Sequence, residues 1–160
     1  MALSLGGLVS VTRIEKDFAV TADGAWLWAR HLAEIGTVEP DFVAVAERFL
    51  HVPYLWGGRT SEGIDCSGLV QTALTTAGIA APRDSDLQEA ALGAPVPVDG
   101  PLARGDLVFW KGHVGVMRDA GTLLHANGWH MSVVSETIRE ARDRTMEKAG
   151  EPITSIRRID

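Results

Sequence analysis

The sequence predicts an α+β domain in which helices precede an antiparallel sheet of about five to six strands. Two observations support this fold class. Apolar residues from Cys66 to Ala77 recur with the spacing i, i+3, i+4, i+7, which is typical of an amphipathic helix. Short β-like runs, separated by Gly112 and Gly121, then fill residues 106–126. Helices followed by a run of strands is the order of the α+β class.

The first residues have a different pattern from the rest. Runs 8–11, 18–21 and 25–28 are apolar and β-branched or aromatic, and the Asp23-Gly24 pair between the last two is a hairpin signal. We therefore expect a β segment over residues 1–37 and a main domain over residues 38–160.

The main domain is predicted to begin with two helices. Pro40 suits a first helical turn, and the apolar spacing after it predicts a helix over about 40–50. A loop rich in glycine and aromatic residues follows over 51–64. The second helix begins at Asp65 or Cys66 and ends at Gly78, because glycine is the usual residue just beyond a helix.

A third helix and the sheet complete the prediction. Ser85 and Gln88 match a capping box, which predicts a short helix to about Leu92, and the prolines and glycine of 95–101 predict a loop. Ser135 can cap a last helix. The expected strands are 106–111, 113–118, 122–126, 132–134 and 153–159, and the last helix spans 136–149.

Composition excludes several classes of protein. Hydrophobic residues make up 46% of the 160 residues and charged residues 22%, as in ordinary globular domains. The net charge of −6 and the absence of a Lys/Arg run give no reason to expect nucleic acid or a membrane as partner. Residues 1–7 lack the basic and apolar regions of a secretory signal, which favours a cytoplasmic protein.

The chain has a single cysteine, Cys66, which excludes an internal disulfide and makes a cysteine-based zinc site improbable. A lone cysteine is most often a small buried apolar residue. Cys66 is placed differently, because it occupies the first turn of a helix that Asp65 can cap. A helix N-terminus favours a thiolate, so we expect a lowered thiol pKa and a nucleophilic role for Cys66.

A nucleophilic cysteine needs a base within hydrogen-bond reach. His113 begins a predicted strand directly after a Lys111-Gly112 turn, and His125 ends the next strand. As cross-strand neighbours, His125 would accept the Nδ1 proton of His113 and orient its ring. The remaining histidines are interpreted as surface or structural residues: His31, His51 and His130.

Five segments, in this order, resemble the NlpC family of cell-wall cysteine peptidases, and the resemblance covers about residues 40–160. They are 52–58 (VPYLWGG), 63–70 (GIDCSGLV), 105–110 (GDLVFW), 112–116 (GHVGV) and 124–127 (LHAN). The resemblance implies a compact papain-like fold without a metal or organic cofactor.

The same resemblance implies a role for individual residues. Cys66 falls on the nucleophile of the Asp-Cys-Ser-Gly motif and His113 on the base. His125 falls on the third polar residue. Tyr54, the only tyrosine, falls on the residue that helps to stabilise the oxyanion, together with the backbone N–H of Cys66.

Residues 82–85 (PRDS) look like the substrate-binding segment of the γ-D-glutamyl-diamino-acid endopeptidase branch. This implies that Asp84 pairs with the free amine of an L-Ala-γ-D-Glu stem and that Ser85 hydrogen-bonds the adjoining peptide. Asp65, Ser67 and Trp56 are further candidates for substrate contact. The alternatives are a helix cap for the Asp84-Ser85 pair, and a core or groove-wall position for Trp56, as for Trp110.

The first 37 residues resemble half of a bacterial SH3-like barrel, through 17–20 (DFAV) and 23–27 (DGAWL). So short a segment cannot close a barrel alone. It therefore either pairs with a second chain, which would make a homo-oligomer, or covers the catalytic domain.

The function implied is a cysteine endopeptidase that hydrolyses the γ-D-glutamyl–diamino acid bond of peptidoglycan-derived peptides. Two alternatives stay open: an N-acetylmuramoyl-L-alanine amidase or acyltransferase on the same scaffold, and an inactive muropeptide-binding module. The sequence does not separate a soluble muropeptide from intact wall as substrate.

Overall fold

The computed structural model describes residues 3–159. They form two compact units, one up to Val38 and one from Glu39. We call them the N-terminal unit and the main domain and describe each by itself. The boundary lies one residue from the one expected from the sequence.

The N-terminal unit is a three-stranded antiparallel sheet in the order β1-β2-β3, followed by one turn of 3-10 helix. Its first strand begins at Val11, not at residue 8. A two-residue loop with Lys16 at positive φ joins Glu15 to Phe18, and the register that it sets pairs Val11 with Thr21, the last residue of β2. The Asp23-Gly24 turn joins β2 to β3 as predicted. The elements are β1 (Val11–Glu15), β2 (Phe18–Thr21), β3 (Trp26–Trp28) and η1 (Ala29–His31).

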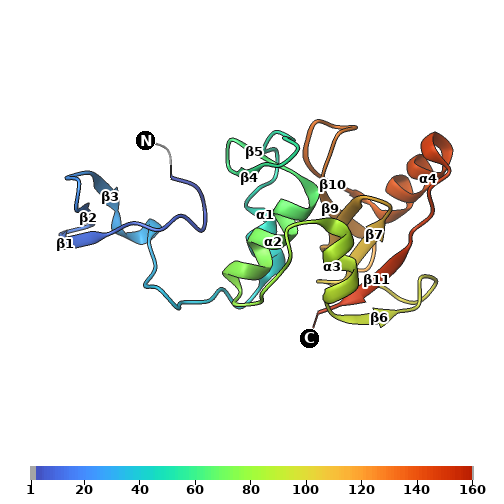
Figure 1. Ribbon diagram of the computed structural model, residues 1–160, viewed down its shortest axis with the longest axis horizontal. Coiled ribbons are helices and arrows are strands. Elements are labelled where there is room, and N and C mark those ends of the chain that lie inside the picture. Colours follow the sequence, from blue (N-terminus) through green and yellow to red (C-terminus); the bar gives the residue numbers. More distant parts are fainter. Residues whose placement is uncertain (1–2, 160) are drawn as a thin grey trace. The chain divides into compact units, whose positions relative to one another are not determined.

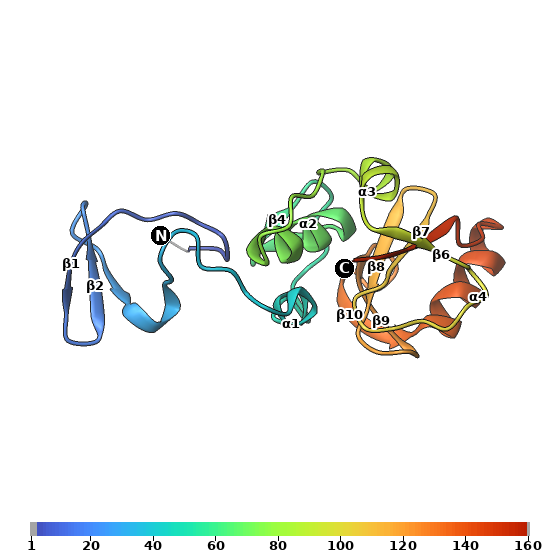
Figure 2. The same cartoon turned by 90° about the horizontal axis from the view of Figure 1, so that it is seen from below.

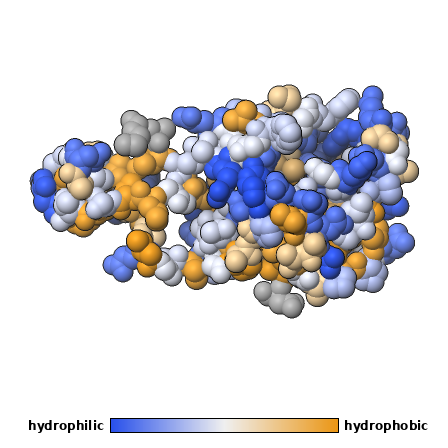
Figure 3. All heavy atoms as spheres, in the orientation of Figure 1, coloured by the Kyte–Doolittle hydropathy of each residue, from blue (hydrophilic) through white to orange (hydrophobic). Residues whose placement is uncertain are grey.

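Little of the described part of the N-terminal unit is buried. Ala19, Val20 and Thr21 are its buried residues, whereas Leu8 and Ile14 are largely exposed, and apolar side chains are visible on its surface (Figure 3). The SH3-like resemblance stays a prediction.

Two helices open the main domain (Figure 1). Helix α1 (Phe42–Glu47) is capped by Asp41, whose carboxylate accepts the N–H groups of Val43 and Ala44. Pro40 therefore lies outside the helix, which is shorter than the predicted 40–50, because the aspartate satisfies the first free N–H groups one residue later. Helix α2 (Cys66–Thr76) has Asp65 as its N-cap, as predicted.

Helix α3 (Ser85–Ala91) corrects a detail of the sequence prediction. Its N-cap is Asp84 rather than Ser85, and no side chain caps it. The expected capping box is absent because Gln88 is fully buried and donates instead to the carbonyls of Ser67 and Pro82.

Helix α4 (Ile138–Ala149) begins later than predicted. Thr137 and Glu140 form a capping box there, so Ser135 is not the cap. Strand β10 therefore continues to Thr137 and includes Glu136, which the sequence had assigned to the helix.

A six-stranded antiparallel sheet forms the centre of the main domain, in the order β10-β9-β8-β7-β11-β6. Strand β6 was predicted as loop because of Pro95, but it is an edge strand, where proline is tolerated. A small hairpin, β4–β5, lies in the predicted loop 51–64. The strands are β4 (Arg59–Thr60), β5 (Gly63–Ile64), β6 (Ala94–Val96), β7 (Leu107–Trp110), β8 (His113–Met117), β9 (Thr122–Asn127), β10 (Ser132–Thr137) and β11 (Ser155–Arg158).

Helices α2 and α4 lie on opposite sides of this sheet (Figure 2). Helix α2 packs mainly on β8 and β9. On the other side, Ala141 of α4 packs against a buried cluster that includes Trp110, Met117 and Leu123. The α+β class and the strand number predicted from the sequence are confirmed.

Gly115 allows β8 and β9 to pack closely. A Cβ atom at this position would lie 2.8 Å from Leu123 Cδ1 and 3.2 Å from the Cβ atom of His125. We expect Gly115→Ala to lower the free energy of unfolding by about 1–3 kcal/mol through overpacking, measured by denaturant titration. At Gly121 the same change would meet only an Asp119 oxygen at 3.8 Å. Gly121→Ala is the control, and an equal loss there would contradict the explanation.

Candidate active site

The buried carboxylate of Asp65 fixes the first turn of α2. It accepts the N–H of Gly68 at 2.7 Å, which caps the helix, and the N–H of Gly57 at 2.7 Å. Arg83 completes its shell with two hydrogen bonds, of 2.9 and 2.6 Å. Asp65 is only 4% exposed, so its carboxylate holds the loop and the helix together. The substrate contact expected for Asp65 from the sequence does not fit this burial.

Ser67 is also turned inward. Its hydroxyl accepts from Arg83 at 2.9 Å and its carbonyl accepts from Gln88 at 2.9 Å, so it too serves the local framework rather than a substrate. A Cβ atom at the neighbouring Gly68 would lie 2.5 Å from the carbonyl oxygen of Gly58. The glycine is therefore required for the close approach of the Gly58 backbone to the first turn of α2.

Cys66 is the first residue of α2 and is 7% exposed. Burial raises the pKa of its thiol, and the negative charge of Asp65 adds to this, whereas the backbone of Val114 lowers it. The predicted lowering of the pKa is wrong, because desolvation outweighs the helix N-terminus. At rest the residue is a thiol, and it lies against the second residue of β8.

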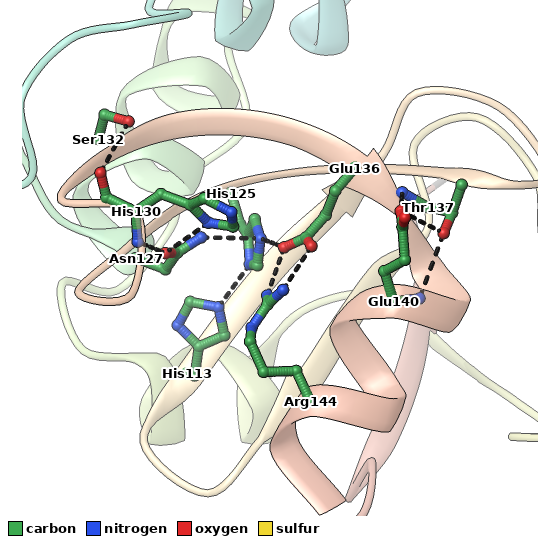
Figure 4. A network of polar contacts seen from close by, with 9 residues as sticks. All are labelled: His113, His125, Asn127, His130, Ser132, Glu136, Thr137, Glu140 and Arg144. Atoms are coloured by element: carbon green, nitrogen blue, oxygen red, sulfur yellow. Dashed lines mark hydrogen bonds and ion pairs between the residues drawn. The ribbon is translucent and has the colours of Figure 1, made fainter. Parts of the chain in front are cut away.

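His113 and His125 meet as predicted. Their rings are 5.1 Å apart between centroids, and Nε2 of His113 lies 2.8 Å from Nδ1 of His125 (Figure 4). The atom is not the expected one, because it is Nε2 of His113, not Nδ1, that makes the bond. The Nδ1 atom of His113 consequently points away from His125. Among the described residues, the hydrogen-bond partner of the His113 ring is His125, not Cys66.

Two further residues, which the sequence analysis missed, continue this chain of contacts. Glu136 Oε1 lies 2.7 Å from His125 Nε2, and Arg144 of α4 donates to both oxygens of Glu136, one bond being 2.6 Å. The available signal was the β-branched pair Val133-Val134. Strand β10 continues from this pair to Thr137 and places Glu136 beside β9, in register with Leu123.

The charges in this cluster follow from its burial. Burial, with repulsion from His125, lowers the pKa of His113 to about 3, and burial also lowers that of His125. Burial alone would raise the pKa of Glu136, but Arg144 and His125 outweigh it and hold it at about 2. At neutral pH two neutral imidazoles therefore face an ionised carboxylate.

Tyr54 lies close to the cysteine. Its backbone pairs with Ile64, in the segment that leads directly into α2. Burial raises the pKa of its phenol, with further contributions from the nearby Cys66 and Asp65. The phenol therefore keeps its proton and is a hydrogen-bond donor.

The remaining candidates for substrate contact lie at the surface. The Asp84 side chain is exposed and makes no cap bond with the helix it precedes, and Ser85 is partly exposed. Trp56 is 88% exposed, so a core position is wrong for it, whereas Trp110 is 2% exposed and belongs to the core.

Within residues 3–159, no helix has the length and apolar character needed to cross a membrane. The same residues contain no cluster of three histidine, cysteine or acidic side chains suited to a metal ion.

The cysteine begins a helix that packs on an antiparallel sheet, and one strand of this sheet begins with a histidine. This arrangement defines the papain-like class of α+β folds. The chain belongs to the NlpC/P60 family, whose model matches residues 51–149.

Two curated relatives are from Bacillus subtilis. The gamma-D-glutamyl-L-lysine dipeptidyl-peptidase is 37% identical over 113 residues, which are 66% of this chain and 37% of that protein. The gamma-DL-glutamyl hydrolase is 36% identical over 114 residues, 65% of this chain and 27% of that protein. The chain thus spans between about a quarter and little more than a third of the length of these relatives.

Solved structures give the same fold. An NlpC/P60 family protein from Bacillus cereus superposes with a TM-score of 0.73 at 26% identity, covering 94% of this chain and 53% of the other. The peptidoglycan hydrolase RipB from Mycobacterium tuberculosis superposes with a TM-score of 0.60 at 31% identity, covering 74% and 62%.

The Arg83–Asp65 pair makes a testable contribution to stability. Burial alone would raise the pKa of Asp65, but Arg83 and the N–H groups of Gly68 and Gly57 hold it below its usual value. Because the folded pKa is depressed, this stability is present above the unfolded pKa of about 3.9 and is lost as pH falls through the folded pKa. Arg83→Met should lower the free energy of unfolding by about 3 kcal/mol at pH 7, because it leaves a buried carboxylate without its charged partner.

The loss should shrink toward pH 4, as Asp65 of the variant takes up a proton, and chemical denaturation across pH measures it. Arg48 pairs with Glu39 through side chains that are 51% and 40% exposed. Arg48→Met is the matched control and should cost at most about 0.5 kcal/mol. Equal, pH-independent losses in the two variants would contradict this account of Asp65.

Proposed function

We propose that this protein is a cysteine peptidase that hydrolyses the γ-D-glutamyl–diamino acid bond of peptidoglycan stem peptides with a free N-terminal L-Ala. The main supporting observation is the placement of the lone cysteine at the head of α2, against β8, whose first residue is hydrogen-bonded to His125. The relatives named for γ-glutamyl cleavage support the choice of bond.

The reaction starts from a neutral pair, because the pKa of the Cys66 thiol is raised and that of His113 is lowered. The proton of the Cys66 thiol passes to Nδ1 of His113, the ring nitrogen that the bond to His125 leaves free. The sulfur attacks the γ-glutamyl carbonyl carbon as this proton leaves. Transfer within the bound complex avoids a buried charge pair in the resting protein.

The tetrahedral intermediate carries its charge on the former carbonyl oxygen. The Tyr54 hydroxyl and the N–H of Cys66, in the first turn of α2, are the donors for this oxyanion. His113 then returns the proton to the leaving amine, so that the diamino acid departs and an acyl-enzyme remains. Water, deprotonated by His113, hydrolyses the thioester and restores the thiol.

Recognition of the free amine is assigned to Asp84. Its carboxylate is exposed, makes no cap bond to α3 and follows directly on Arg83, which is fixed to Asp65. An ammonium group bound there would sit at a fixed position relative to α2. An amidase substrate offers no such amine, and an inactive binding module would retain the peptide without cleaving it.

Cys66→Ala should remove turnover and keep the fold. We expect the rate of hydrolysis of L-Ala-γ-D-Glu-diamino-acid peptides to fall by on the order of 10⁴-fold or more. Mass spectrometry of the products measures this rate. Thermal unfolding of the variant checks that the domain is intact. Undiminished cleavage by a purified, folded Cys66→Ala protein would rule out the mechanism.

Asp84→Asn should weaken binding of substrates with a free amine. We expect KM to rise about tenfold to a hundredfold, the effect of losing one charged hydrogen bond, with little change for N-acetylated peptides. Asp86→Asn is the control, since Asp86 is exposed in the first turn of the same helix. If acetylation of the peptide made no difference to the parent protein, Asp84 would have no part in recognition.

A further inference from the structure

The Nε2 atom of His125 has two neighbours that require opposite proton positions. Glu136 Oε1, at 2.7 Å, can only accept a proton from it. Asn127 Nδ2, at 2.9 Å, can only donate one to it. The orientation of the Asn127 amide is fixed, because a flip would exchange its oxygen and nitrogen, and its oxygen accepts the backbone N–H of His130 at 2.8 Å.

Which neighbour prevails decides the proton positions on both imidazoles. If Nε2 of His125 donates to Glu136, its Nδ1 is bare and accepts from Nε2 of His113, which leaves Nδ1 of His113 bare. If Asn127 donates instead, His125 carries its proton on Nδ1, Nε2 of His113 becomes the acceptor, and Nδ1 of His113 carries a proton. Only the first arrangement gives a base at that atom.

We propose that Glu136 is a positioning residue of the active site: its carboxylate accepts the Nε2 proton of His125 and thereby makes His113 present an unprotonated Nδ1. This rests on the proposed function only in naming Nδ1 of His113 as the base. The proton positions themselves are properties of the resting protein.

Burial and charge favour Glu136 over Asn127. The carboxylate is largely buried, with 11% of its side chain exposed, and Arg144 holds it with two hydrogen bonds. A bond to an ionised acceptor is stronger than one between neutral groups, so the 2.7 Å contact with Glu136 dominates. Figure 4 shows the continuous line from His113 through His125 and Glu136 to Arg144.

The same carboxylate stabilises the imidazolium that forms during the reaction. The groups that face His125 are His113 from β8, Glu136 from β10, Arg144 from α4 and His130 after β9. Among them Glu136 alone is negative, and its charge raises the pKa of both His113 and His125 against burial. Removing it should therefore lower both values further.

The test reads the proton positions directly. Histidine is labelled with nitrogen-15 in the full chain carrying Cys66→Ala, and the protonated and bare ring nitrogens are distinguished by NMR before and after Glu136→Gln. We expect Nε2-protonated His113 and His125 in the parent, and a shift to Nδ1-protonated rings in the variant. On acid titration, both imidazoles of the variant should take up protons at lower pH than in the parent.

Activity is measured separately with Cys66 intact. Glu136→Gln should lower kcat on the order of 10²-fold or more, as expected for a base in the wrong tautomer, with KM changed less than about threefold. If Arg144 without its partner prevents folding, Glu136→Gln with Arg144→Met removes both charges, and its spectra and rates are read in the same way.

Glu140→Gln is the matched control, because Glu140 caps α4 through Thr137 and does not touch His125. It should leave the ring proton positions and kcat unchanged. Unchanged tautomers in Glu136→Gln, altered ones in Glu140→Gln, or imidazole titration moving up toward the ordinary histidine value would each overturn the positioning role. Because the tautomers are read without substrate, that result stands even if the proposed peptide is not cleaved.

Discussion

The carboxylate of Asp65 is the point at which three segments of the main domain meet. It caps the helix that begins with Cys66, holds the glycine loop through Gly57 and pairs with Arg83, one residue before Asp84. A single buried charge thus fixes the nucleophile relative to the segment proposed to bind substrate. Loss of either partner would leave the other uncompensated in a low-dielectric interior, which ties the position of the sulfur to the stability of the domain.

Local patterns in the sequence were enough for the parts of the site that depend on neighbours in the chain. Asp65 before an apolar helical stripe predicted the start of α2, and the spacing of His113 and His125 about a hairpin predicted their contact. Glu136 was missed because its assignment depended on where β10 ends. A capping box at Thr137 decided that boundary, and the cap available at Ser135 misled the prediction by two residues.

The ionisation of Cys66 could not be predicted from its position in the sequence. A helix N-terminus favours a thiolate, but the opposing cost is set by how completely the sheet covers the sulfur, which is a tertiary property. With the thiol 7% exposed and the partly buried His113 ring beside Trp110, both groups are neutral at rest. Pro40 and Pro95 show the same limit, since their placement depends on the cap at Asp41 and on the edge position of β6.

The edge strand β6 has a consequence for how the protein behaves at high concentration. It has only three residues and a proline at its centre, so its outer side offers few backbone donors to an incoming strand. Exposed sheet edges are templates for aggregation and amyloid, and short, proline-containing edges resist it. This side of the sheet is therefore protected against growth into fibrils by the same residue that concealed the strand in the sequence.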